Sequence, residues 1–173
     1  MGLDMNFITN SKELSKVMSK YWAGEHYMEE SCRKRGEIGY WRKFSALHNW
    51  MVTNVQYGED DCGTYEVDAD KLLKLYDVIK SCTDAIANFD VEDDEELVDM
   101  LDDMFPMTNG FFFNPTDAWD WHIGYIEETK KWFDMLFDNL YYDKEEHAFY
   151  FRDKETGKID IDQEVRFWYN ASW

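Results

Sequence analysis

Apolar residues recur with helical spacing in several segments of the chain. In the segment 40–55 the residues that share one helical face are Tyr40, Phe44, Leu47 and Met51. Three further helices are predicted in the same way, over residues 10–21, from Asp68 with an apolar stripe that reaches Ile86, and from residue 114 to about Tyr141. Asn10 or Ser11 caps the first, Asp68 the second, and Asn114 followed by Pro115 begins the third.

Short apolar runs with strand character fill much of the remainder. The candidate strands are Thr64–Val67, Gly110–Phe113, Ala148–Asp153 and Glu164–Asn170, with a turn at residues 154–158 between the last two. Residues 23–39 are polar and interrupted by glycine, which predicts a loop. We therefore predict an α+β fold, dominated by helices, with a small antiparallel sheet in a single globular domain over residues 1–173.

One more helix is predicted over residues 93–105, and its two faces differ sharply. Its apolar stripe consists of Leu97, Met100, Leu101, Met104 and Phe105. The opposite face carries only acids. Like-charged pairs four residues apart, such as Glu95 with Asp99, cost about 0.2–0.5 kcal/mol each in an exposed helix. Asp102 and Asp103 also lie at the helix end where the dipole disfavours negative charge.

Acids dominate the composition, with 37 Asp and Glu against 18 Lys and Arg and a net charge of −19. Between Ser81 and Thr129 the chain holds fourteen acids and no Lys or Arg. One interpretation is that this charge only keeps the chain soluble; the other is that it meets a basic partner. For the second interpretation the candidate partner-binding residues are Asp90, Glu92, Asp93, Asp94, Glu95, Glu96, Asp99, Asp102 and Asp103, helped by Glu59, Asp60 and Asp61.

The same charge argues against direct binding to nucleic acids or to anionic membranes, both of which are negative. No run of 18 apolar residues and no signal peptide is recognisable, and we expect a cytoplasmic protein. The three cysteines, Cys32, Cys62 and Cys82, are expected to be free thiols. The chain contains no phosphate-binding loop and no catalytic serine or cysteine motif, so we expect a protein that is not an enzyme and uses no cofactor or metal.

Three weaker alternatives concern histidines and aromatic residues. His26 could join Glu25, Glu29, Glu30 and Cys32 in a metal site if the loop folds back. We expect His48 to be a hydrogen-bonded, partly buried residue, whereas His122 could pack in the core or line a pocket. An aromatic pocket near residues 110–121 could accept a flat base or nucleotide.

Five patches together resemble a family of short phage- and prophage-encoded proteins. They read "MGLDM", "YWRKFSALHNWMV", "DDCGTYEV", "GFFFNPTDAWDW" and "YNASW". The resemblance implies a mobile-element origin and action inside a bacterial host, and it carries over no functional residue. Small acidic phage proteins of this kind are often inhibitors of host defence, including anti-CRISPR proteins.

These observations lead to one functional hypothesis and two alternatives. The hypothesis is a phage-encoded inhibitor whose acidic surface mimics nucleic acid and binds a basic, nucleic-acid-binding defence nuclease, in particular an RNA-guided one. The first alternative is a protein that binds or degrades a small nucleotide signal, and the second is a structural or assembly protein of a phage.

Overall fold

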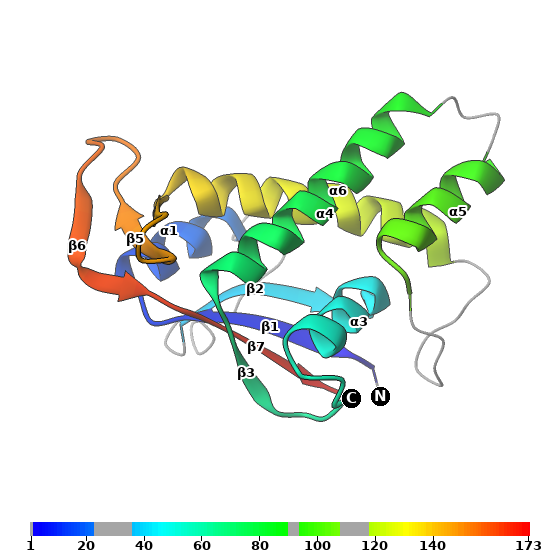
Figure 1. The fold of residues 1–173 in the computed structure, drawn as a ribbon, viewed down its shortest axis with the longest axis horizontal. Helices are drawn as coiled ribbons and strands as arrows, with labels where there is room; N and C mark the ends of the chain where they lie inside the picture. Colours follow the sequence, from blue (N-terminus) through cyan, green and yellow to red (C-terminus); the bar gives the residue numbers. More distant parts are fainter. Residues whose placement is uncertain (1, 23–35, 90–93, 108–117) are drawn as a thin grey trace.

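The computed structural model describes residues 2–22, 36–89, 94–107 and 118–173 (Figure 1). The helices within these ranges are α1 (Lys12–Trp22), α3 (Ser45–Asn54), α4 (Ala69–Asn88), α5 (Asp94–Met104) and α6 (Ala118–Asp138). The strands are β1 (Asp4–Thr9), β2 (Glu37–Arg42), β3 (Thr64–Val67), β4 (Leu140–Asp143), β5 (Ala148–Arg152), β6 (Ile159–Val165) and β7 (Phe167–Ser172). The predicted α+β class, in which helices dominate, is confirmed.

The strands form two antiparallel sheets rather than the single sheet that we predicted. The larger sheet has the order β2-β1-β7-β3, and the smaller has the order β4-β5-β6. Strand β1, at one end of the chain, pairs with β7 at the other, so that Asp4 lies opposite Ser172. Figure 1 shows the two termini side by side and α4 crossing α6 over the larger sheet.

An aromatic cluster joins the larger sheet to α6. Phe7, Trp41 and Trp132 are almost fully buried and contact one another edge to face, with the two indoles 5.1 Å apart between ring centroids. Each indole N–H has an acceptor, because Trp132 donates to the carbonyl of Ile38 and Trp41 donates to the hydroxyl of Thr129. Buried indoles need such partners, and these two bonds fix α6 to β2.

The predicted helix over residues 40–55 is wrong in its first part. Residues 37–42 form β2, paired with β1, and α3 begins only at Ser45. Between them Lys43 adopts a left-handed backbone conformation, with φ of 58°, which separates strand from helix. Residues 37–39, predicted as part of a loop, belong to the same strand.

Two boundaries near the C-terminus are also corrected. The candidate strand 164–170 is divided at Arg166, so that β6 ends in the smaller sheet and β7 begins in the larger one. Helix α6 ends at Asp138 instead of about Tyr141, because residues 140–143 pair with β5. The pairing with β5 satisfies the backbone of this segment in place of a last helical turn.

Local capping signals predicted the starts of two helices correctly. Ser11 Oγ accepts a hydrogen bond from the Leu14 amide at the start of α1, and Asp68 Oδ1 accepts one from the Lys71 amide at the start of α4. Strand β3 also lies where it was predicted. The predicted strand 110–113, the Asn114 cap and most of the loop 23–39 lie outside the described residues.

Candidate functional site

Helix α5 is held to the protein by its apolar face. Leu101 and Phe105 are buried, and the Phe105 ring contacts the Phe44 ring edge to face at 5.8 Å between centroids. Asn49 of α3 donates a hydrogen bond to the carbonyl of Pro106, just beyond the helix. The helix also packs against α4 (Figure 1). The predicted division of this segment into a core face and an outer face is confirmed.

The outer face of α5 is acidic and open to solvent. The exposed carboxylates are those of Glu95, Glu96, Asp99, Asp102 and Asp103. None of these five forms an ion pair with any residue that the structure describes, and the last helical turn contains no basic residue. Of the other predicted positions, Asp94 begins the helix, while Asp90, Glu92 and Asp93 lie outside the described residues.

Met100 does not lie in the core stripe as we predicted. Its side chain is 37% exposed, whereas Val98, which we had not included, is half-buried. The geometry explains both outcomes, since at about 100° per residue Met100 lies roughly a quarter turn from the centre of the stripe and Val98 lies nearer to it. The acidic face therefore has one apolar side chain at its border.

The three acids of the α3–β3 loop are exposed, but two of them have structural partners. Asp60 Oδ1 lies 2.9 Å from Nε2 of His48. Asp61 accepts hydrogen bonds from the Gly63 amide and the Tyr65 hydroxyl, at 2.8 and 2.9 Å. Glu59 has an exposed side chain. Figure 1 draws this loop between α3 and β3, near the C-terminus, and draws α5 beside the far end of α4, so the two predicted acidic segments are separate surfaces.

His48 connects the loop to the sheet. It is 2% exposed, and its Nδ1 lies 2.8 Å from the hydroxyl of the fully buried Tyr169. The Asp60 carboxylate can only accept, so Nε2 carries a proton and, in the neutral ring, Tyr169 donates to Nδ1. Burial, followed by the charge of Asp60, raises the pKa of Tyr169 well above its ordinary value. The prediction of a hydrogen-bonded His48 is confirmed.

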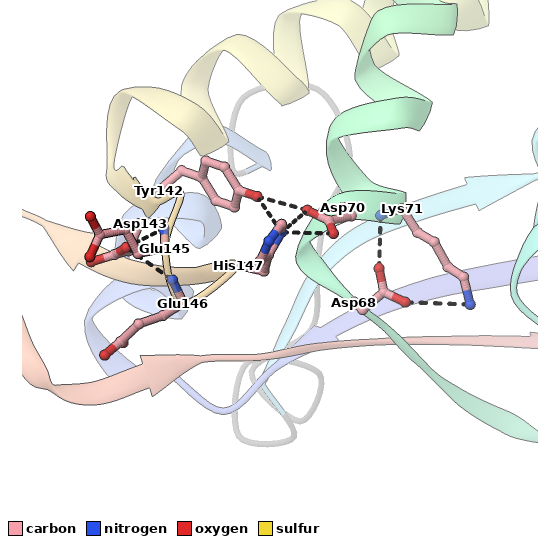
Figure 2. A network of polar contacts seen from close by, with 8 residues as sticks. All are labelled: Asp68, Asp70, Lys71, Tyr142, Asp143, Glu145, Glu146 and His147. Atoms are coloured by element: carbon pink, nitrogen blue, oxygen red, sulfur yellow. Dashed lines mark hydrogen bonds and ion pairs between the residues drawn. The ribbon is translucent and has the colours of Figure 1, made fainter.

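A second polar cluster lies at the start of α4 and joins three segments (Figure 2). The Asp70 carboxylate accepts hydrogen bonds from Nδ1 of His147, at 3.0 Å, and from the Tyr142 hydroxyl, at 2.7 Å. The bond from His147, followed by that from Tyr142, lowers the pKa of Asp70. His147 lies in the β4–β5 turn with a left-handed φ of 52°, so the cluster fastens that turn to α4.

Asp68 and Lys71, on either side of Asp70 in the chain, are bonded to each other. Asp68 contacts Lys71 twice, through the helix-capping bond and through an ion pair at 3.4 Å between Oδ2 and Nζ. The ammonium of Lys71 lies 5.6 Å from the ring centroid of Tyr57, at the end of α3. Tyr57 is 86% exposed and has a left-handed φ of 58°. The start of α4 thus collects side chains from four parts of the chain.

The remaining candidates from the sequence are His122, the cysteines and a metal site. His122 is a packing residue, since it is buried against Phe44 with Nε2 3.4 Å from the Ser45 hydroxyl, and burial lowers its pKa to about 4. Cys62 and Cys82 are free thiols. Within the described ranges no three His, Cys, Asp or Glu side chains gather as a metal site. The His26 metal hypothesis, Cys32 and most of the aromatic segment 110–121 fall outside those ranges.

Comparisons with protein-family models, with curated proteins and with solved structures found no match. The helices of the described segments include none that combines the length and the apolar character required to span a bilayer. The resemblance to phage-encoded proteins therefore stays a prediction.

The sequence did not indicate Tyr57 or the Asp70 cluster as candidate sites. Asp70 and His147 are 77 residues apart, and Asp70 and Tyr142 are 72 apart, so no local spacing connects them. For Tyr57 a local signal was present. The pair Tyr57-Gly58 follows directly after a predicted helix, where residues with a left-handed backbone conformation are common.

Proposed function

We propose that the chain is a phage-encoded inhibitor of a host defence nuclease, of the anti-CRISPR type, which acts in the bacterial cytoplasm. In this proposal the acidic face of α5 occupies a groove lined by Lys and Arg and competes there with nucleic acid. An RNA-guided nuclease offers such a groove for its heteroduplex and for the displaced strand. The inhibitor itself performs no catalysis and needs no cofactor.

The observation that carries this proposal is the state of the α5 carboxylates. Five of them are exposed on one face, and none is neutralised by a cation of the described chain. Their mutual repulsion opposes helix formation, while Leu101 and Phe105 on the other face hold the helix in place. A rigid row of unpaired charges can enter a basic groove without first breaking ion pairs of its own.

The experiment measures target-DNA binding by a panel of purified RNA-guided nucleases, each loaded with its guide. We expect the protein to abolish DNA binding by at least one of them, and higher salt to weaken this effect. The test variant replaces the five exposed acids of α5 with lysine: Glu95, Glu96, Asp99, Asp102 and Asp103. A matched control makes the same change in charge at five exposed acids outside α5: Asp77, Asp84, Glu127, Glu145 and Glu155.

The test variant should lose inhibition, and the control should keep it. Circular dichroism and thermal unfolding establish that both variants remain folded. A folded α5 variant that still inhibits, or equal loss in the control, contradicts the role of this face. If no nuclease of the panel is inhibited, the proposed function itself fails.

A further inference from the structure

Two cationic side chains converge at the end of β2, in a chain that is otherwise strongly acidic. The point at which a side chain on Gly2 would begin lies 3.4 Å from Cε of Lys43 and 3.5 Å from Nη2 of Arg42. The ends of both side chains therefore lie close together over the Gly2 backbone. Like charges at such a separation repel each other, and an anion bound between them relieves the repulsion.

The chain itself neutralises only part of this positive charge. Among the described residues Arg42 has one acidic partner, Asp4, at 3.7 Å between Nε and Oδ1, and the Arg42 side chain stays 62% exposed. The Asp4 carboxylate also accepts a hydrogen bond from the hydroxyl of Tyr40. Lys43 is exposed and forms no ion pair with any residue that the structure describes. Two cations that share one carboxylate leave a net positive charge at this point of the surface.

Tyr125 of α6 lies beside the two cations. Its ring stacks on the ring of Phe44, which follows Lys43 directly in the chain, at 5.2 Å between centroids. Burial, followed by the charge of Glu128, raises the pKa of Tyr125, whereas the Arg42 guanidinium lowers it. The guanidinium is therefore within electrostatic reach of the Tyr125 hydroxyl, and this residue connects α6 to the cationic pair.

Trp121 extends the aromatic surface by one helical turn. It lies four residues before Tyr125, on the same face of α6, and its side chain is 71% exposed. Within the described part of the chain no other ring and no cation lies against the indole. Gly124 neighbours Trp121 on the helix surface, and beyond the helix itself no atom lies within 4 Å of the point where a side chain on Gly124 would begin. The indole is thus accessible to a flat ring from outside.

We propose that Arg42, Lys43 and Trp121 form a binding site for a mononucleotide. The phosphate accepts hydrogen bonds from the guanidinium and the ammonium, and the base stacks on the indole. A nucleotide matches this surface because it joins an anion to a flat ring, whereas inorganic phosphate or a nucleoside provides only one of the two. The acids of the rest of the chain oppose an anion only weakly, because at physiological salt exposed charges more than about 8 Å away are largely screened.

The experiment titrates AMP, GMP, CMP and UMP, one at a time, into the ¹⁵N-labelled full chain and follows the N–H signals. We expect at least one nucleotide to cause saturable shifts of the Trp121 indole and of the amides of residues 42–44. The matching nucleoside and inorganic phosphate, each titrated alone, should bind at least about tenfold more weakly, because each retains only one of the two contacts.

Two variants remove the contacts one at a time. Lys43→Asn removes the ammonium and suits the left-handed backbone at this position, with φ of 58°, and should weaken nucleotide binding about tenfold. Trp121→Ala removes the ring and should weaken nucleotide binding by a similar factor, without an effect on inorganic phosphate. The matched controls Lys80→Asn and Tyr141→Ala make the same changes at exposed positions of α4 and β4 and should bind as the wild type does.

Circular dichroism establishes that all four variants remain folded. The proposal is overturned if none of the four nucleotides shifts these signals at millimolar concentration, or if the two site variants bind as well as the two controls. Inorganic phosphate that binds as tightly as the nucleotides would also overturn it, since the ring would then contribute nothing. These outcomes are independent of nuclease inhibition by the α5 face.

Discussion

The hydroxyl of Tyr169 joins the larger sheet to α3 through one buried hydrogen bond with His48. Tyr169 is 0% exposed and His48 is 2% exposed, and their polar atoms lie 2.8 Å apart. The substitution Tyr169→Phe removes this oxygen and keeps the ring that packs against Phe7. Nδ1 of His48 is then buried without its partner, which costs about 1–3 kcal/mol of folding free energy.

The measurement is urea denaturation followed by tryptophan fluorescence, together with the thermal midpoint. For a chain of this size each kcal/mol lowers the midpoint by about 2–4 °C, so a decrease of roughly 2–12 °C is expected for Tyr169→Phe. The matched control is Tyr65→Phe. Tyr65 is the cross-strand partner of Tyr169, and its hydroxyl bonds to the exposed Asp61. Loss of that exposed hydroxyl should change stability by less than about 0.5 kcal/mol.

A double-mutant cycle tests the reasoning directly. In the variant His48→Leu the Tyr169 hydroxyl loses its partner, and in the double variant neither buried group is left unpaired. The cost of the double variant should therefore be smaller than the sum of the two single costs, by about 0.5–3 kcal/mol. Additive costs, or equal stability of Tyr169→Phe and Tyr65→Phe, would refute the account of this hydrogen bond.

Three further predictions follow from burial and from pKa directions. The pKa of Asp70 is lowered in the folded state from its ordinary 3.8, so the stability that its carboxylate contributes is fully present above pH 3.8 and is lost as the pH falls through the folded-state pKa. Unfolding curves of the wild type and of Asp70→Asn should therefore converge below the folded-state pKa. Leu101→Ala should destabilise by about 2–5 kcal/mol and increase hydrogen exchange in α5, whereas Met100→Ala at the exposed border should cost less than about 0.5 kcal/mol in the same assay. A thiol reagent should modify exposed Cys62 quickly and Cys82 only on unfolding, because burial excludes the reagent and raises the pKa of Cys82 to about 11, as peptide mapping by mass spectrometry can establish.

The sequence predicted those elements whose signals are local. Ser11 and Asp68 cap their helices as expected, because a capping bond spans only three residues. The failure at residues 40–42 has a physical cause. Tyr40 and Phe44 have helical spacing, but residues 40–42 pair with β1, more than 30 residues away in the chain. A short apolar run fits either structure, and only the distant partner decides between them.

The candidate surfaces also differ in whether local sequence signals could predict them. The acidic face of α5 was predictable, since helical periodicity alone places Leu101 on one side and Asp99 on the other. The cluster at the start of α4 was not, because Asp70 lies 72 and 77 residues from Tyr142 and His147 in the chain and only the tertiary fold brings them together. The exposure of the Tyr57 ring could not be predicted either, because an aromatic ring is expected to be buried in the core unless the backbone directs it outward.

The energetics of α5 explain how a helix can carry so much unpaired charge. The like-charged pairs Glu95–Asp99 and Asp99–Asp103 cost about 0.2–0.5 kcal/mol each. Removal of a large buried side chain such as Leu101 or Phe105 costs about 2–5 kcal/mol. The apolar face therefore outweighs the repulsion several times over, and folding sets only a weak limit on which charges the outer face bears. A preference for stability alone would still mix the signs there, and a uniformly acidic face is what the proposed binding to a basic groove requires.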